Sequence, residues 1–387
     1  MADCNARTSG LGDVYVCGGQ SNMAFSLGAN ENAQQYANEA NKYPTIRLFT
    51  VGTRTSSKVP LMDLQTISQN WSVASNTSVT DHSKFGRFSA VCWFFGKNVY
   101  DGLGGSVPIG LVSNNWPGTM VEQWTKPETT KRCGHLSTGE LYNAMIEPYT
   151  VGPMAVQGFT WYQGESNFGG TPGLPDKYQN GNYTCIQTAL IQQWRSAFKV
   201  PDAFFGVVQL STWLYPHAGQ SGPIPHLLAV LRDQQLASAT AVGKGFAYAT
   251  NADYGAGNNI HPPYKQHVGQ RLANAALSIV YGQPINWRSP TYATATATAI
   301  GTGRSVSVTV VLHDVEAAGL VLKDAFNQRK PPMLRGCASL NKANPGTCAF
   351  GSVQFNNAAR SWADATVGLS AVVGSIEGAK GIVGLGE

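Results

Sequence analysis

Val14-Tyr-Val-Cys-Gly-Gly-Gln-Ser-Asn-Met23 is the stretch of sequence that decides the fold. Its first four residues form a short β-type run that stops at two glycines. Ser21 therefore lies just beyond the carboxyl end of a predicted strand. Because open α/β sheets bind their ligands outside the carboxyl ends of the strands, this position favours a chemical role for Ser21.

Two later segments repeat the pattern of an apolar run that ends in glycine and polar residues. Residues 107–112 lead into Asn114-Asn-Trp-Pro-Gly118, and residues 156–162 lead into Gln163-Gly-Glu165. Each run is short and rich in β-branched or aromatic residues, which is typical of a buried strand. The sequence therefore predicts three strands that end in similar polar loops.

Helical patterns separate the predicted strands. Residues 90–100 and 188–198 place apolar side chains at three-to-four spacing, and a further helix is expected after His261-Pro-Pro. Alternation of strand and helix predicts an α/β fold with a parallel sheet wound with helices.

The character of the sequence changes near Arg288-Ser-Pro290. Beyond it, the Ala-Thr repeat of residues 293–299 and the run over residues 305–312 show β-type alternation with few helix signals. We therefore expect an α/β catalytic domain over residues 1–289 and a smaller β-rich C-terminal module over residues 290–387.

Composition limits the classes of partner. The chain has 387 residues, a formal net charge of +5 and only 13% charged residues. No run of Lys and Arg that could track phosphates occurs, which argues against nucleic acid as a partner. No stretch of about 18 apolar residues occurs either, so we expect a soluble protein without a membrane span. The first residues lack the charged start and apolar core of a signal peptide, and we expect a trimmed start.

Seven cysteines are present, and none stands in a CxxC or paired-histidine pattern that would indicate zinc. Cys337 and Cys348 flank a turn-rich loop that a disulfide would staple. Cys133 and Cys185 lie in polar contexts that suit a second disulfide. We therefore expect two disulfides and no metal site.

The remaining cysteines are expected to be free. Cys17 and Cys92 sit inside apolar runs and are interpreted as buried thiols, with Cys4 left over near the start of the chain. Three N-x-S/T sequons also occur, at Asn70, Asn76 and Asn182. Sequons and disulfides together predict a secreted protein, or one of the lysosomal or endomembrane lumen.

Ser21 and His261 are the residues in which a nucleophile and its base are expected. A serine on a tight glycine-flanked turn can expose its hydroxyl while neighbouring N–H groups converge on a developing oxyanion. A serine in this place can equally cap the next helix. His261 lies in a polar loop that opens a helix, where it can serve as a base, although a lone loop histidine is more often a surface residue. Position alone leaves these alternatives open.

Four motif blocks follow one another along the chain: Gly12-Asp-Val-Tyr-Val-Cys-Gly-Gly-Gln-Ser-Asn-Met23, Trp116-Pro-Gly-Thr-Met-Val-Glu-Gln-Trp124, Trp161-Tyr-Gln-Gly-Glu-Ser-Asn167 and Ile260-His-Pro262. In this order they resemble the successive blocks of the sialate O-acetylesterase family, which belongs to the broader SGNH-type hydrolases. Weaker likenesses fill the intervals, so the resemblance covers roughly residues 12 to 280. It implies an SGNH-hydrolase-like three-layer α/β/α domain with a central parallel sheet.

The resemblance implies a serine hydrolase that removes acetyl esters from a sugar or glycan, O-acetylated sialic acid above all, without metal or cofactor. It assigns Ser21 as nucleophile and His261 as general base. The backbone N–H groups of Ser21 and Gly118 and the side chain of Gln163 would form the oxyanion hole. Without the resemblance, Gly118 reads as a turn glycine and Gln163 as a loop anchor. Three more residues inside the blocks are expected to support the site: Glu165, Glu122 and Asn22.

The acid of a catalytic triad is the least explicit assignment. SGNH enzymes often place an aspartate three residues before the histidine, where this chain has Asn258. Asp253 is the nearest upstream carboxylate and is the candidate for orienting His261, while a loop-capping role is equally well supported. Pro117 stands where relatives often have a second glycine, which removes one backbone donor but leaves that of Gly118.

Two alternative functions stay open. One is an acetylesterase for acetylated xylan or another plant or algal polysaccharide, and the other is a carbohydrate-binding protein that keeps the fold without turnover. Because sialic acid carries a carboxylate, a basic anchor near Ser21 would favour the sialate reading, and Arg232 and Lys265 are the candidates. Three aromatic residues beside the predicted site are candidates for stacking on a sugar, although packing is their commoner role: Trp116, Trp161 and Tyr162.

Overall fold

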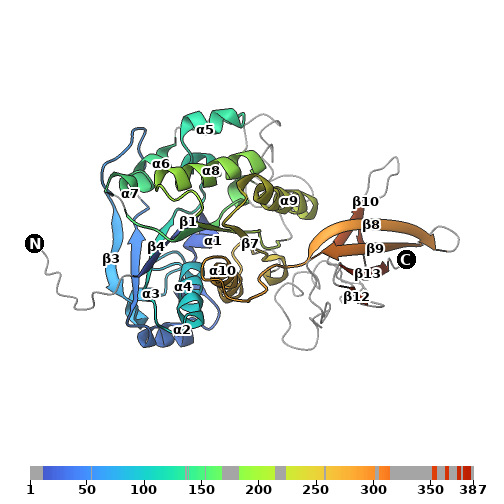
Figure 1. Cartoon of the computed structure of the whole chain (residues 1–387), viewed down its shortest axis with the longest axis horizontal. Coiled ribbons are helices and arrows are strands. Elements are labelled where there is room, and N and C mark those ends of the chain that lie inside the picture. Colours follow the sequence, from blue (N-terminus) through green and yellow to red (C-terminus); the bar gives the residue numbers. More distant parts are fainter. Residues whose placement is uncertain are drawn as a thin grey trace, which may run out of the picture.

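The structure is a computed structural model, and it describes most of the chain up to residue 313. The described ranges are residues 12–53, 55–135, 137, 139–152, 154–167, 183–213, 224–256, 259–300, 305–313, 351–354, 362–365, 373–375 and 378–384. Within them, helices cover both faces of a central sheet (Figure 1). The predicted three-layer α/β fold is confirmed.

The central sheet has seven strands in the order β3-β2-β4-β1-β5-β6-β7. Their bounds are β1 Asp13–Gly19, β2 Ile46–Val51, β3 Ile67–Val73, β4 Ile109–Asn115, β5 Gly158–Tyr162, β6 Phe204–Val208 and β7 Phe246–Ala249. All neighbours pair in parallel except β2 and β3. Since β4 and β5 flank β1 on opposite sides, the end of β1 lies where the strand order changes direction, which is where α/β sheets bind ligands.

The helices form two layers (Figure 1). One face of the sheet carries α2 Ala33–Glu39, α3 Asn76–Val79, α4 Ala90–Gly102 and α10 Lys265–Ile279. The other carries α5 Pro127–Arg132, α6 Glu140–Met145, α7 Pro148–Val151, α8 Tyr183–Ala197 and α9 Ile224–Val242. Short elements complete the set: α1 Ser21–Ala24, η1 Leu27–Ala29, η2 Ala40–Lys42, η3 Val121–Trp124, η4 Glu165–Asn167 and η6 Ala252–Tyr254.

The helices predicted from periodicity are α4, α8 and α10. Helix α4 begins after Ser89, whose hydroxyl accepts a hydrogen bond from the Cys92 N–H at 3.1 Å and so caps the helix. Helix α10 begins at Lys265, just beyond the two prolines that follow His261. It buries Val268, Leu272 and Leu277, the apolar positions that its pattern predicts.

The C-terminal part is built of antiparallel strands. β8 Thr291–Ile300 and β9 Ser305–His313 form a hairpin that extends to the right of the main sheet in Figure 1. The sheet β12-β13-β9-β8 adds β12 Val373–Ser375 and β13 Gly378–Gly384, and β10 Gly351–Gln354 pairs with β11 Trp362–Ala365. A domain boundary directly before β8 stays a prediction.

Two disulfides connect described residues. Cys133 and Cys185 are joined as predicted, with Cα atoms 5.7 Å apart. The expectation of free thiols at Cys17 and Cys92 is wrong, because these residues form a disulfide with Cα atoms 5.8 Å apart. Cys17 lies on β1 and Cys92 in the first turn of α4, so packing of the helix on the sheet brings two apolar runs together. Burial alone therefore did not distinguish a thiol from a disulfide. The predicted Cys337–Cys348 pair and Cys4 lie outside the described residues.

Two of the three sequons lie on exposed surface, with Asn70 on β3 and Asn76 at the start of α3. Asn182 lies outside the described residues. Within the described ranges, no helix combines the length and apolarity needed to cross a membrane.

Candidate active site

The loops that carry three of the four motif blocks meet at one edge of the sheet. β4, β1 and β5 are parallel neighbours, so the residues after their carboxyl ends converge. Two hydrogen bonds extend the strand pairing: Trp116 N–H donates to Gly19 O at 3.0 Å, and Gln20 N–H donates to Tyr162 O at 3.0 Å. The loops that follow β4 and β5 therefore flank Ser21.

Ser21 is the first residue of α1 rather than its cap. Gln20 holds the N-cap position and makes no side-chain capping bond. Ser21 is buried, with 6% of its surface exposed. The helix-capping alternative therefore does not describe this serine.

Two glycines shape the backbone around Ser21 for different reasons. Gly19 has φ +143°, and a Cβ there would lie 2.1 Å from Tyr162 O, so only glycine fits between β1 and β5. Gly118 has φ +77° and open space where a Cβ would stand, so its left-handed backbone alone favours glycine. The turn after β4 thus presents an exposed backbone near Ser21.

The loop that carries His261 is held beside α1 at two points. Asn22 Nδ2 donates to Ile260 O at 2.9 Å, directly before the histidine. Glu31 N–H donates to Pro263 O at 2.8 Å, two residues after it. His261 thus lies between two backbone anchors on the segment that follows Ser21.

The imidazole of His261 is half-buried against an aromatic ring. Its ring and that of Phe85 meet edge to face, with centroids 5.4 Å apart.

Next to Ser21 in the chain, Asn22 forms a buried cluster with Glu165 and Lys265 that we call the base flank. Asn22 Nδ2 donates to Glu165 Oε1 as well as to Ile260 O, and Asn22 Oδ1 accepts from Lys265 Nζ. With an amine that donates to its oxygen and a carboxyl oxygen that accepts from its nitrogen, the amide has one favourable orientation. Lys265 thereby fixes the amide that holds the His261 loop.

Burial shifts the pKa of both ionisable groups of the base flank. Lys265 has no exposed surface, and burial lowers its pKa to about 7 despite the opposing charge of Glu165. Burial raises the pKa of Glu165, although hydrogen bonds and Lys265 oppose the rise. The Lys265 Nζ lies 5.1 and 5.2 Å from the ring centroids of Phe25 and Tyr162, which compensates part of its lost hydration. A lysine held in this way is not a free anchor for a substrate carboxylate.

A second set of residues forms a chain of polar groups that we call the oxyanion flank: Gln163, Asn167, Glu122 and His135. Gln163 Nε2 donates to Asn167 Oδ1 at 2.6 Å. Asn167 Nδ2 donates to the two carboxylate oxygens of Glu122 at 3.1 and 2.9 Å. Glu122 Oε1 in turn lies 2.8 Å from His135 Nδ1. The loop after β5 is thus tied to residues that follow the Gly118 turn.

Gln163 contacts the side chain of the residue before the candidate nucleophile and the backbone of the loop after β4. Its Nε2 lies 3.0 Å from Gln20 Oε1 and 3.2 Å from Thr119 O, and its Oε1 accepts from Tyr183 OH at 2.6 Å. With Asn167, three acceptors share two amide hydrogens. These contacts are those of a loop anchor, and the oxyanion role of Gln163 stays a prediction.

The carboxylate of the oxyanion flank differs from that of the base flank. Burial alone would raise the pKa of Glu122, but hydrogen bonds from His135 and Asn167 outweigh it and hold the pKa below its usual range. Glu122 therefore keeps its negative charge, whereas ionisation of Glu165 is disfavoured.

Asp253, the candidate triad acid, lies in η6 and faces Arg271. Its oxygens accept two hydrogen bonds from the guanidinium, at 2.7 and 2.6 Å, and about half of its side chain is exposed. Arg271 also donates to Thr250 O at 2.7 Å. This bidentate pair ties the loop after β7 to α10, and the assignment of Asp253 as the acid that orients His261 stays a prediction.

The aromatic candidates divide between core and surface. Trp161 and Tyr162 have no exposed surface, and Trp161 packs edge to face against Trp124 and Trp194. Their position is that of core residues, whereas Trp116 is partly exposed.

Arg232, the second basic candidate, is also engaged inside the fold. Its Nε donates to Leu210 O at 2.6 Å, and burial lowers its pKa to about 10. Its position on α9 is therefore that of a structural arginine.

Sequence reasoning missed Phe85 and the structural role of Lys265. Phe85 belongs to none of the motif blocks, so no spacing pointed to it. Lys265 follows His261 by four residues, and this proximity was the only available signal. Whether a lysine at a helix start is buried depends on tertiary packing, which the sequence does not show.

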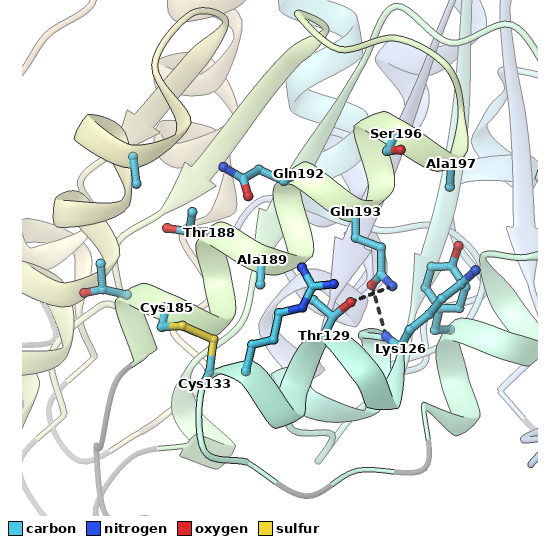
Figure 2. A pocket seen from close by; sticks show the side chains of 14 residues that line it. Lys126, Thr129, Cys133, Cys185, Thr188, Ala189, Gln192, Gln193, Ser196 and Ala197 are labelled. Carbon is cyan, nitrogen blue, oxygen red and sulfur yellow. Dashed lines mark hydrogen bonds between the residues drawn. A yellow bond between two sulfur atoms is a disulfide. The ribbon is translucent and has the colours of Figure 1, made fainter.

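A groove of about 680 Å³ lies between α5 and α8, beside the Cys133–Cys185 disulfide (Figure 2). Gln193 crosses it and accepts a hydrogen bond from the Lys126 N–H at 3.0 Å. None of its described lining residues belongs to the four motif blocks. The groove is therefore not part of the candidate active site.

Residues 11–278 match a family model described as carbohydrate esterase, sialic acid-specific acetylesterase. The chain is 31% identical to sialate O-acetylesterase of Pongo abelii over 312 residues, and 30% identical to that of Homo sapiens over 312 residues. Each alignment covers 70% of this chain and 54% of the relative, so the chain spans about half the length of these curated relatives. A solved carbohydrate acetylesterase from Xanthomonas citri is similar over 96% of this chain and 72% of its own, with a TM-score of 0.66 and 27% identity.

Proposed function

Because this chain belongs to the family of sialic acid-specific carbohydrate acetylesterases, we propose that it removes O-acetyl groups from sugars, with O-acetylated sialic acid as the preferred substrate. Ser21 attacks the acetyl carbonyl while His261 takes its proton. The sugar alcohol leaves with that proton, and water then cleaves the acetyl-enzyme. The backbone N–H groups of Ser21 and Gly118, with Gln163, stabilise the oxyanion.

One observation carries this proposal. The loops after β4, β1 and β5 converge around Ser21, and Asn22, the residue next to Ser21, bonds the backbone directly before His261. Residues separated by 238 positions are thereby brought to one edge of the sheet. A nucleophile, a base and backbone donors in one place are the parts that acyl transfer requires.

The test is Ser21→Ala, with release of acetate from an O-acetylated sialic acid as the measurement. We expect turnover to vanish and the unfolding temperature to stay unchanged, since the hydroxyl supplies the covalent path and little stability. Ser106→Ala, which changes an exposed serine, is the matched control. Substantial turnover by folded Ser21→Ala would reject the mechanism. Faster turnover of acetylated xylan than of sialic acid by the wild type would replace the substrate and keep the mechanism.

Asp253 is retained as the candidate acid, and the bidentate contact with Arg271 supports its alternative role as a brace. An orienting acid is needed mainly in the transition state, so Asp253→Asn would lower kcat by orders of magnitude with KM little changed. A brace would instead lower the unfolding temperature and leave most of kcat. Arg271→Gln is the matched variant, because it breaks the ion pair and keeps the carboxylate.

We also propose that the reaction needs no metal, because a serine, a histidine and backbone donors supply nucleophile, base and charge stabilisation. Activity is expected to survive dialysis against a chelator. Loss of activity that zinc restores would contradict this. The two disulfides support a secreted or lumenal location, which detection of the protein in a secretory fraction would test.

A further inference from the structure

The loop of residues 81–87 lies against the segment that follows α1. Ser26 N–H donates to Lys84 O at 2.9 Å, and the Ser26 hydroxyl donates to Ser83 O. Ser26 is buried, so these hydrogen bonds attach the loop to the interior of the fold. None of the four motif blocks includes this loop, yet it borders the candidate active site.

Phe85 projects from this loop beside the candidate base. Its ring meets those of His261 and Phe25 edge to face, with centroids 5.4 and 6.4 Å away. Even so, 42% of Phe85 is exposed. An aromatic ring that contacts His261 and keeps this much of its surface exposed is suited to pack against the apolar face of a sugar ring.

The loop also carries positive charge, and its two cations are placed differently. Lys84 is exposed, with its Nζ 5.4 Å from the Phe85 ring centroid, and its charge contributes to lowering the pKa of the buried Lys265. Arg87 instead contributes to lowering the pKa of Asp81. Lys84 therefore lies beside the ring that contacts His261, whereas the charge of Arg87 acts on a carboxylate of its own loop.

The conformation of the loop is strongly constrained. His82 and Arg87 have φ of +64° and +53°, a region that residues other than glycine seldom occupy. Asp81 Oδ1 accepts from both the N–H and the hydroxyl of Ser83, at 3.1 and 2.7 Å. Such strain persists only where the surroundings enforce it, so the backbone that carries Lys84 and Phe85 is constrained.

We propose that residues 81–87 form the subsite for a carboxylate-bearing sugar, with Phe85 stacked on the sugar ring and Lys84 bound to its carboxylate. The inference rests on the proposed function and adds the residues that select an acidic sugar over a neutral one. Lys265 and Arg232, the cations considered from the sequence, are both engaged inside the fold. Lys84 is therefore the cation that we assign to binding the carboxylate of the substrate.

The charge is tested with one sugar in two forms, O-acetylated N-acetylneuraminic acid and its methyl ester, which lacks the negative charge. The wild type should have a higher kcat/KM for the free acid. Lys84→Gln should lower kcat/KM for the acid about tenfold and leave the methyl ester within twofold, because one charge-assisted contact is lost. Arg87→Gln is the matched control and should keep the preference. Equal preference in Lys84→Gln and wild type, or equal loss in both variants, would overturn the assignment.

The stacking of Phe85 on the sugar ring is tested by Phe85→Ala. The control is Trp71→Ala, which removes an exposed ring on β3. KM should rise several-fold for both sugar forms, about threefold to tenfold from the lost ring contact, and Phe85→Tyr should restore it. The rate at which a fluorophosphonate labels Ser21 should stay unchanged. A slower labelling rate would show that Phe85 acts by packing against His261, and would overturn its assignment as a sugar-binding residue.

Failure of this inference differs from failure of the proposed function. If the wild type releases acetate from neither sugar form, the proposed function fails. If it releases acetate from both and the Lys84 and Phe85 variants behave like their controls, the subsite alone fails.

Discussion

The two flanks of Ser21 use the same elements in different ways. In each, an amide side chain bonds a buried carboxyl group and a second residue of the site. Asn22 bonds Glu165 and the backbone before His261, and Asn167 bonds Glu122 and Gln163. The oxyanion flank is also secured covalently, because Cys133 lies two residues before His135 and its partner Cys185 lies two residues after Tyr183. The base flank is held by Lys265 and by the hydrogen bonds of Asn22. Similar contacts are thus reinforced by a disulfide in the oxyanion flank and by a buried lysine in the base flank.

The strongest test of this difference removes the disulfide of the oxyanion flank. Cys133→Ala/Cys185→Ala should lower the free energy of unfolding by about 2–4 kcal/mol, because a cross-link over 52 positions no longer restricts the unfolded chain. We expect kcat to fall less than tenfold, since the hydrogen bonds of Asn167 and His135 remain. Denaturant unfolding and acetate release are the measurements. A loss below about 1 kcal/mol would mean that hydrogen bonds alone hold the flank.

On the base flank, Lys265→Met keeps the length of the side chain and removes its charge. Asn22 Oδ1 then loses its donor, the His261 loop is held less firmly, and kcat should fall about a hundredfold, as expected for a displacement of about 1 Å. Lys244→Met, which changes an exposed lysine, should leave kcat unchanged. Wild-type kcat in Lys265→Met would show that Asn22 keeps its orientation without the cation.

The stability of Lys265→Met should also depend on pH. Because the pKa of Lys265 is lowered to about 7 in the fold, the unfolded chain binds more protons between this pH and its usual pKa. Wild-type stability gains from this difference as pH rises from about 7 toward 10. The variant lacks this gain, so its deficit should grow over that range. A deficit that is constant with pH would contradict the lowered pKa.

The two carboxylates should respond to pH in opposite directions. Glu122 has a lowered pKa, so its stabilisation is present above the usual carboxyl pKa and is lost on acidification. Glu165 has a raised pKa, so its ionisation costs stability as pH rises. Glu122→Gln should therefore cost about 1–3 kcal/mol at pH 7 and less below about pH 4. Glu165→Gln should compare more favourably with the wild type as pH rises. Parallel slopes in urea unfolding would contradict the assignment.

The smallest effect is expected at the turn after β4. Gly118→Ala introduces a Cβ into open space, so only the cost of the left-handed backbone remains, about 1–2 kcal/mol. Thermal unfolding measures this cost. Gly19→Ala is the contrasting variant, because its Cβ would meet Tyr162 O, and it should be much more destabilised. Equal losses in the two variants would contradict this distinction.

Much of the fold could be predicted because it depends on local pattern. The apolar runs before Gly18 and Gln163 became β1 and β5, and the spacing of apolar residues after His261 became α10. The convergence of loops at the end of β1 followed from a general rule of parallel sheets. These features can be predicted without knowing which side chains are in contact in the folded protein.

The contacts that define the site could not be predicted, because they depend on tertiary packing. The sequence around Cys17 is that of a buried thiol, and only the packing of α4 on the sheet brings Cys92 within disulfide distance. The sequence offered Lys265 as a surface anchor, whereas packing encloses it beside Asn22. The contact between Phe85 and His261 joins segments with no shared motif.

The separation in sequence of the base-flank residues has a consequence for refolding. Asn22 and Glu165 are 143 positions apart, and Asn22 and Lys265 are 243 apart. Contacts between such distant segments form slowly, because closing long loops costs entropy before any contact repays it. Helical circular dichroism should therefore return before acetate release does when the oxidised chain is diluted from denaturant. Return of activity is therefore expected to report the last contacts to form.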